Sequence, residues 1–284
     1  MNSLVNFLTY TLAYARKSVG NPHFGWVERL GLFWLLMQLL VKSKYHADKP
    51  VIQRGFGFTM FAPDPQLLLQ LVLEIFVDGI YYFESEKTAP KIIDGGANIG
   101  ISVLYFKYLY PQAHIVAIEP NPAALVYLER NIKENKLSQI TLIPAALSAE
   151  SGEGNLHYSP CISLLNASLM HDSEVDRAKV STHKLSDYLR GNQIDLVKLD
   201  IEGAEEQVIG EIADQGEIHN AKQYIVEYHP SADSPSGRIL LESIFKGIGY
   251  TLDEKSPDKG TESAPTILNF LYKAPRFLPV YHTG

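Results

Sequence analysis

The fold is decided by the stretch Ile92-Ile93-Asp94-Gly95-Gly96-Ala97-Asn98-Ile99-Gly100. It reads as a short buried strand, a glycine-rich turn and a helix that opens near Asn98. The glycines let the backbone turn sharply and approach a ligand closely, and the helix start directs free N–H groups to the same place. The stretch therefore predicts a cradle for a nucleotide-like ligand.

A second strand, which ends in Ile118-Glu119-Pro120, supports this interpretation. Glu119 follows Gly100 by about 20 residues, the distance at which a parallel α/β sheet places a carboxylate against the hydroxyls of a ribose. We therefore expect an adenosine ligand. A tight strand-to-helix turn that binds no ligand is the alternative for the glycine motif alone.

The glycine spacing bears on which adenosine ligand is bound. A dinucleotide site of the form G-x-G-x-x-G would have Ala97 in place of its second glycine, which is an imperfect match. The register D-x-G-x-N-x-G fits better, since it uses Asp94, Gly96, Asn98 and Gly100 and is typical of S-adenosylmethionine-dependent methyltransferases. Their ligand has no pyrophosphate, and its amino-acid end carries an ammonium that an acid at the turn suits.

Strand and helix patterns alternate regularly after residue 90, which predicts an α/β fold with a mostly parallel sheet. We expect strands at 91–94, 114–119, 140–143, 194–200, 222–228, 248–252 and 266–273, and helices at 99–109, 122–135, 203–214 and 235–247. By analogy, the last strand is antiparallel and completes a seven-stranded sheet. The predicted organisation is a helical extension (1–50), a hairpin-helix lead-in (51–90), a ligand-binding domain (91–274) and a tail (275–284).

Further polar residues follow two later strands. Lys198, Asp200 and Glu202 alternate along one strand end, and Glu227 and His229 alternate along the next. Acids at the carboxyl ends of parallel strands lie where open α/β sheets bind their ligands, so we expect these groups to converge on one rim.

The rim could supply a general base, a structural ion pair or a metal site. His229 is the first candidate for a base and Asp200 the second, because a hydroxyl nucleophile must lose its proton. A structural hydrogen bond between His229 and Glu227 is an alternative of equal weight. Asp200, Glu202, Glu227 and His229 could instead hold magnesium or manganese, but we do not favour a divalent metal and assign no ligands.

The chain resembles the FkbM family of S-adenosylmethionine-dependent methyltransferases over roughly residues 51 to 273. The resemblance rests on five motifs: Asp94 to Gly100, Ile118 to Pro122, Ala145 to Ser148, Lys198 to Glu205, and Glu227 to His229. It implies a Rossmann-like class I methyltransferase fold and O-methylation of sugars, polyketides and related small molecules. Because this likeness rests on whole motifs, Asp94, Gly95 and Gly100 are grouped with the cofactor-binding residues.

Individual roles follow from the same resemblance. Gly96 and Asn98 would line the methionine moiety, and Glu119 would hold the ribose. Asn121 and Ala146 would flank the adenine. Asp200 would face the reacting centre, with Glu202 beside it, and the acceptor would meet Ser168, Glu227 and His229. Ser168 lies in the stretch from Ser148 to Ser186, which we expect to be a long loop.

Composition and charge limit the function classes. A net charge of −7 argues against a nucleic-acid binder, and the single Cys161, with no secretory signal in view, indicates a cytoplasmic protein. Residues 1–50, however, hold six basic and two acidic residues, around an apolar run from Leu30 to Val41. That run is shorter than the about 20 residues of a membrane span. We expect it to pack on the main domain or on a second copy in a homo-oligomer, with contact to a membrane surface as the alternative.

The sequence thus predicts an S-adenosylmethionine-dependent O-methyltransferase that acts on a hydroxyl of a saccharide or small natural product. Two other functions remain open at this point. One is an NAD-dependent oxidoreductase, which Ala97 and Asn98 disfavour. The other is a non-catalytic adenosine-binding protein whose N-terminal segment holds a partner.

Overall fold

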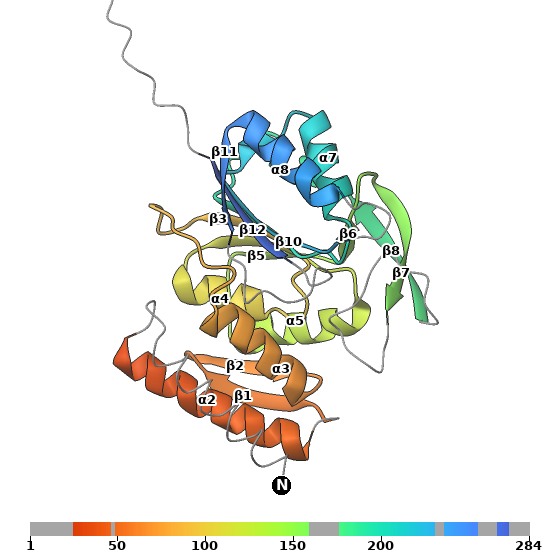
Figure 1. Ribbon diagram of the computed structural model, residues 1–284. Helices are drawn as coiled ribbons and strands as arrows, with labels where there is room; N and C mark the ends of the chain where they lie inside the picture. The colour runs from red at the N-terminus through yellow and green to blue at the C-terminus, as the bar shows by residue number, and fades with distance from the viewer. Residues whose placement is uncertain (1–24, 47–48, 159–175, 231–235, 255–265, 273–284) are drawn as a thin grey trace, which may run out of the picture.

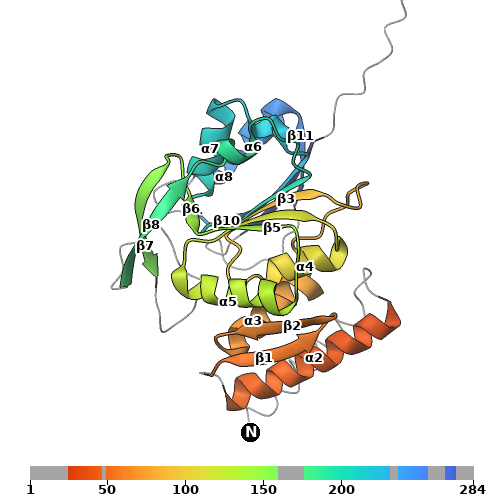
Figure 2. The same ribbon diagram turned by 180° about the vertical axis from the view of Figure 1, so that it is seen from behind.

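A seven-stranded sheet forms the centre of the molecule, and helices cover both of its faces (Figures 1 and 2). The computed structural model describes residues 25–46, 49–158, 176–230, 236–254 and 266–272. Strand order is β11-β12-β10-β9-β3-β4-β5, and β12 is antiparallel to both of its neighbours. The other neighbouring pairs, from β10 to β5, are parallel. This is the Rossmann-like class I methyltransferase fold.

The strands of this sheet are β3 (Lys91–Gly95), β4 (His114–Ile118), β5 (Ile140–Ile143), β9 (Leu196–Leu199), β10 (Gln223–Tyr228), β11 (Tyr250–Glu254) and β12 (Thr266–Tyr272). The helices between them are α4 (Ile101–Leu109), α5 (Pro122–Glu134), α6 (Ser186–Leu189), η2 (Ile218–Asn220), α7 (Glu205–Asp214) and α8 (Gly237–Ile248). All seven strands and the four helices predicted after residue 90 are confirmed, with ends that differ by at most two residues.

Alternating strand residues fill two separate cores. Ile92 and Leu196 face a core shared with α4 and α5, whereas Ile93 and Val197 face a core shared with α7 and α8. Burial on both faces explains why these strands read as continuous apolar runs. Strand β3 lies between β9 and β4, so the strand order reverses at this place in the sheet. Open α/β sheets bind their ligands at the carboxyl ends of the strands beside such a switch point.

The first described segments form a layer outside α4 and α5 (Figure 1). It contains α2 (Trp26–Tyr45), the hairpin of β1 (Val51–Gly55) and β2 (Phe58–Ala62), α3 (Pro65–Val72) and a π-helical turn, η1 (Leu73–Val77). The predicted hairpin is confirmed, and Asp64 accepts N–H bonds of 2.8 Å from Gln66 and Leu67 at the start of α3, as the Asp-Pro pair indicated.

Two asparagines, one in α5 and one directly after its end, attach this layer to the main domain. Asn131 accepts the N–H of Phe61 at 2.8 Å, and Asn135 accepts the N–H of Thr59 at 2.7 Å. Helix α2 packs one side against α3 and the hairpin of the same layer. Among the described residues, no helix combines the length and the apolar character that a membrane crossing requires.

The expectation of a long loop between Ser148 and Ser186 is wrong for its described part. β7 (Gly152–Tyr158) and β8 (Asp176–His183) pair in antiparallel register and join β6 (Ala145–Leu147) in a three-stranded sheet. The sequence hid this sheet because its core is small, with Leu156 and Val180 as its buried large side chains beside Ala146. Ser168 lies outside the described residues.

Candidate active site

The turn after β3 passes very close to the end of β9, and glycine makes this approach feasible. Gly96 has φ +75°, and a Cβ placed there would lie 1.7 Å from the carbonyl oxygen of Asp200. Gly100, with φ +87°, begins α4, so the helix starts two residues later than predicted. Gly96 therefore allows Asp200 to lie against the turn, in addition to the ligand approach that the sequence indicated.

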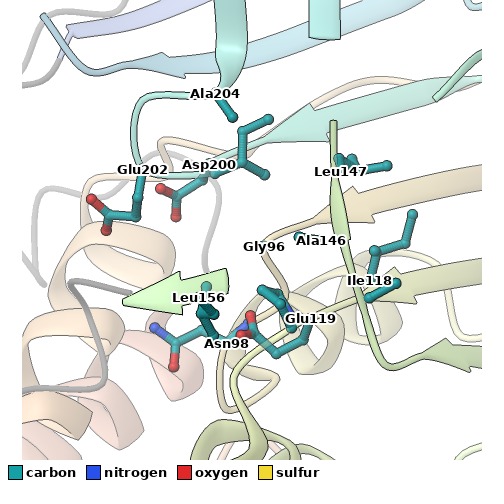
Figure 3. A pocket seen from close by; sticks show the side chains of 13 residues that line it. Gly96, Asn98, Ile118, Glu119, Ala146, Leu147, Leu156, Asp200, Glu202 and Ala204 are labelled. Carbon is teal, nitrogen blue, oxygen red and sulfur yellow. The ribbon is translucent and has the colours of Figure 1, made fainter. Parts of the chain in front are cut away.

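A pocket opens beside this turn, at the carboxyl ends of the central strands (Figure 3). Six of the predicted site residues line it: Gly96, Asn98, Glu119, Ala146, Asp200 and Glu202. The rest of the lining is Ile118, Pro120, Ala145, Leu147, Leu156, Ile201 and Ala204. Asp200 and Glu202 lie across the opening from Asn98 and Glu119 (Figure 3).

Glu119 is held at the end of β4 by backbone donors. Its Oε2 accepts the N–H of Asn98 at 2.7 Å, and its Oε1 accepts the N–H of Asn121 at 2.8 Å. Burial raises the pKa of Glu119 to about 7, although the two N–H groups and Lys198 act in the opposite direction. Each carboxylate oxygen keeps a further lone pair, which ligand hydroxyls can use.

Asn121 serves first as a helix cap. Its side-chain oxygen accepts the N–H of Ala123 at 3.0 Å at the start of α5, directly before Pro122. Its buried Nδ2 has no hydrogen-bond partner among the described residues. A buried amide donor without an acceptor is costly, so this atom is suited to a ligand acceptor.

Asp94 does not line the pocket; it lies buried beneath the turn. Its Oδ2 accepts the hydroxyl of Ser102 at 2.6 Å, and its Oδ1 lies 3.2 Å from Lys198 Nζ. Asp94 can therefore act on a ligand ammonium only at a distance. Gly95 is buried next to it and, like Gly100 and Asn121, is not among the lining residues.

Lys198 was not assigned a role from the sequence, yet it is the buried cation of the site. Its Nζ donates to the carbonyl oxygen of Gly96 at 2.6 Å and lies 3.5 Å from Asp200 Oδ2. Burial alone would lower the pKa of Lys198, but Asp94, Asp200 and Glu227 raise it above its usual value. The sequence signal that could have pointed to this role is a lysine within an otherwise apolar strand.

Tyr81 joins the acids of two strands. Its hydroxyl lies 3.1 Å from Asp200 Oδ2 and 3.0 Å from Glu227 Oε2, and its ring lies over Lys198. Burial, Asp200 and the other nearby acids raise the pKa of this hydroxyl well above its usual value, so it stays protonated. The predicted convergence of Asp200 and Glu227 on one rim is thus present, with a tyrosine between them.

The turn that follows β9 is organised by a buried glutamate, Glu205. Its carboxylate accepts the N–H of Ile201 at 3.2 Å and that of Gly203 at 3.1 Å. Glu202, between them, has φ +54°, a left-handed conformation that costs a non-glycine residue free energy. Burial and the charge of Asp200 raise the pKa of Glu202 to about 7.

His229 lies among carboxylates rather than beside Glu227 alone. Its Nδ1 is 3.1 Å from Glu205 Oε1, and its Nε2 is 3.5 Å from Glu202 Oε2. Burial would lower the pKa of His229, but Glu205, Glu202 and Asp200 raise it to about 10. The side chain therefore carries a proton at neutral pH, which is not the charge state of a general base. Glu205 is a second residue that the sequence interpretation left without a role.

Asp200, Glu227 and His229 bring one potential metal-ligand atom each within 4.8 Å of one another. An imidazolium cannot ligate a metal, and Asp200 already faces the ammonium of Lys198. Burial and the charge of Asp200 also raise the pKa of Glu227 to about 8, so at neutral pH Asp200 is the ionised ligand that the cluster offers. Its other capacity is to orient a polar group and accept a proton at the edge of the pocket.

Comparison with known proteins agrees with this geometry. A family model described as the methyltransferase FkbM domain matches residues 94–258. The chain is 32% identical over 223 residues to methyltransferase sdnD of Sordaria araneosa. This alignment covers 66% of this chain and 85% of that protein. It is 28% identical over 178 residues to 2-O-methyltransferase NoeI of Sinorhizobium fredii, 56% of this chain and 71% of that one. It is 23% identical over 218 residues to 31-O-demethyl-FK506 methyltransferase FkbM of Streptomyces tacrolimicus, and this alignment covers 64% of this chain and 81% of that protein.

Proposed function

Because the chain belongs to the FkbM family of S-adenosylmethionine-dependent methyltransferases, we propose that it methylates a hydroxyl group of a saccharide or small natural product. Two relatives support the choice of oxygen as the acceptor atom, since their names specify 2-O-methylation and 31-O-demethyl-FK506 methylation. The acceptor of the present chain is our proposal, and its support comes from the polar groups at the pocket edge.

One observation carries the proposal: Asp200 is shared by the pocket and by the polar cluster at its edge. It lines the pocket with Gly96 and Glu119, and it also belongs to the polar cluster with Glu227 and His229. An acceptor bound at the polar cluster would therefore meet a ligand of the pocket at Asp200. Asp200 can accept a hydrogen bond from the acceptor hydroxyl and hold its oxygen in line for transfer.

The residues around the pocket fit S-adenosylmethionine. We assign the ribose hydroxyls to the remaining lone pairs of Glu119, and the adenine to the side of Ala146 and Asn121, whose buried Nδ2 needs an acceptor. Gly96 and Asn98 would meet the methionine end. When bound, this cofactor supplies a methyl group that is already activated by a sulfonium, so alignment and exclusion of water supply most of the catalysis.

The acceptor proton needs a base whose pKa is close to the working pH. We assign this role to Glu202, which lines the pocket and has a pKa raised to about 7 by burial and by Asp200. His229 was the first candidate from the sequence, but its proton makes it a positive partner that draws Glu202 and Asp200 together. Ser168 stays a predicted acceptor contact.

Transfer of a labelled methyl group tests the proposed function. The full chain is incubated with methyl-labelled S-adenosylmethionine and panels of saccharides, of hydroxylated natural products and of the matching O-methylated compounds. We expect label on a free hydroxyl and none on the compound whose hydroxyl is already methylated. Label on a nitrogen, a carbon or a carboxylate instead would contradict methylation of a hydroxyl while leaving methyl transfer intact.

A further inference from the structure

Helix α2 is apolar on two opposite sides, and the described residues cover only one of them. Leu32, Leu35, Leu36, Leu39 and Leu40 are buried against α3 and the hairpin. The opposite side, which we name the α2 outer face, consists of Trp26, Val27, Leu30, Trp34, Val41 and Tyr45, with exposed fractions between 45% and 83%. A contiguous set of exposed apolar side chains normally marks an interaction surface, so this face calls for an occupant.

The spacing makes the α2 outer face continuous. Val27, Leu30, Trp34, Val41 and Tyr45 recur at helical intervals, so their side chains form one stripe along the helix. Helix α2 lies at the outer edge of the molecule in both views (Figures 1 and 2). The stripe therefore faces away from the seven-stranded sheet and toward whatever surrounds the protein.

Aromatic residues dominate the α2 outer face. The chain has two tryptophans, Trp26 and Trp34, and both lie here with exposed fractions of 71% and 63%. Tyr45 ends the stripe. Tryptophan and tyrosine are favoured where an apolar layer meets a polar one, because the ring is apolar and its N–H or O–H can stay in water.

Basic side chains accompany these rings. The guanidinium of Arg29 lies 5.5 Å from the ring centroid of Trp26, and the ammonium of Lys44 lies 5.6 Å from that of Tyr45. Lys42 and Arg54 belong to the same layer, and Glu28, the acidic residue of α2, accepts the hydroxyl of Tyr108 at 2.6 Å. The whole chain carries −7, so positive charge is concentrated where the exposed apolar residues are.

We propose that the α2 outer face lies on an anionic lipid membrane, with Trp34 and Leu30 at the boundary between the headgroups and the acyl chains and with Lys44 and Arg54 toward the phosphates. An amphipathic stripe with aromatic residues and basic neighbours binds such a surface through buried apolar area and through charge. A twofold contact uses the same surface patch on both copies, so it would instead place the basic residues of both copies in one interface, which is unfavourable.

A groove beside the α2 outer face fits the same occupant. Its lining includes the apolar or aromatic residues Val27, Trp34, Phe56 and Tyr108, together with Arg54 and Glu28. Apolar side chains beside a guanidinium are suited to an acyl chain whose headgroup carries negative charge, and the Glu28 carboxylate in this groove already accepts the hydroxyl of Tyr108. Together, the stripe and the groove favour lipid over an acidic protein.

Binding to vesicles tests the proposal, and it measures no methyl transfer, so its outcome is independent of the proposed function. The full chain is mixed with vesicles of phosphatidylcholine alone or of equal parts phosphatidylcholine and phosphatidylglycerol, and bound protein is measured by co-sedimentation. Both tryptophans belong to the α2 outer face, so we also expect their emission to shift to shorter wavelength and to be quenched by brominated lipid, with the mixed vesicles only.

Two variants and a matched control separate this surface from unspecific adhesion. Leu30→Gln with Val41→Gln removes exposed aliphatic groups of the stripe and should weaken vesicle binding at least about tenfold. Lys44→Gln with Arg54→Gln should weaken it by about the same factor and reduce its salt dependence. Ile239→Gln with Leu240→Gln removes an equally exposed aliphatic pair from α8 and should leave binding unchanged.

Several results would overturn the membrane proposal. They are no sedimentation with mixed vesicles, equal binding to both kinds of vesicle, or equal binding by the Leu30/Val41 variant. A wild-type dimer in sedimentation-velocity runs without lipid that the same variant abolishes would assign the face to a second copy. If the Leu30/Val41 variant fails to fold, the charge variant and the quenching measurement decide.

Discussion

The Tyr81 hydroxyl lies 3.1 Å from Asp200 Oδ2, although 119 positions separate the two residues in the chain. The same hydroxyl lies 3.0 Å from Glu227 Oε2. A tyrosine has one proton to donate, so both contacts are satisfied together only when one carboxyl is protonated. Burial, and then the charge of Asp200, raises the pKa of Glu227 to about 8, so Glu227 holds that proton at neutral pH.

Replacing Tyr81 by Phe tests this arrangement. Without the hydroxyl, Asp200 loses a donor and Glu227 loses its acceptor, so Asp200 is less well positioned. We expect kcat to fall about tenfold while the affinity for S-adenosylmethionine changes less than about twofold. Tyr82→Phe is the matched control, since Tyr82 bonds Glu84 away from the pocket and should retain full activity. An unchanged kcat in Tyr81→Phe would remove Tyr81 from the positioning of Asp200.

Asp200→Asn should nearly abolish turnover, by about a thousandfold or more, while cofactor affinity stays within an order of magnitude. The amide keeps the size of the side chain but loses the charge that faces Lys198 and orients the acceptor hydroxyl. Single-turnover kinetics with labelled cofactor and a calorimetric titration measure the two quantities separately. Equal turnover in the variant and the wild type would show that Asp200 has no part in the reaction.

The pH profile tests the assignment of Glu202 as base. A base must be ionised, so kcat should rise as the pH increases through about 7, the raised pKa of Glu202. Glu202→Gln should lower kcat and remove this rising limb. Glu129→Gln, on the exposed side of α5, should leave both unchanged. A rising limb that survives in Glu202→Gln would assign the base to another group.

The high pKa of His229 gives a prediction about stability. A histidine whose pKa rises from 6.5 to about 10 on folding stabilises the protein fully below pH 6.5, and this contribution is lost as the pH rises toward 10. The free energy of unfolding of the wild type should therefore fall over this range more steeply than that of His229→Gln. Urea unfolding at several pH values measures the difference, and equal slopes would contradict an imidazolium at this position.

Gly96→Ala tests the close approach of the turn to β9. Because a Cβ would lie 1.7 Å from the Asp200 carbonyl oxygen, the strand end must move, and we expect a loss of about 3 kcal/mol or more in the free energy of unfolding. Gly210→Ala, in α7 with open space around it, should be neutral or slightly stabilising. A Gly96→Ala protein as stable as the wild type would show that this contact is loose.

The main sheet could be predicted from the sequence because its strands and helices carry strong local patterns. Buried parallel strands such as Ile92 to Asp94 are apolar runs that end in glycine or acid, and Asn121-Pro122 marks a helix start. The sheet of β7 and β8 carried no such pattern, since its buried face contains few large side chains. Local periodicity cannot report a sheet that is held mainly by backbone hydrogen bonds.

The site was predicted in its residue types but not in its charge states. Glu119, Asp200 and Glu227 follow from their places at strand ends, whereas Tyr81 reaches them from the lead-in through a contact that no local pattern encodes. The charge of His229 depends on Glu205, which the turn of residues 201–203 folds back toward it. Such pKa shifts come from three-dimensional proximity and could not be obtained from the order of residues.

Calorimetric titration of S-adenosylmethionine into the wild type and Glu119→Ala tests the central claim, that the pocket beside Gly96 binds this cofactor through Glu119. We predict saturable binding by the wild type, about a hundredfold weaker binding by the variant because two charge-assisted hydrogen bonds are lost, and no comparable binding of NAD by either. No binding heat with S-adenosylmethionine alongside tight binding of NAD, or equal affinities in the wild type and Glu119→Ala, would contradict it.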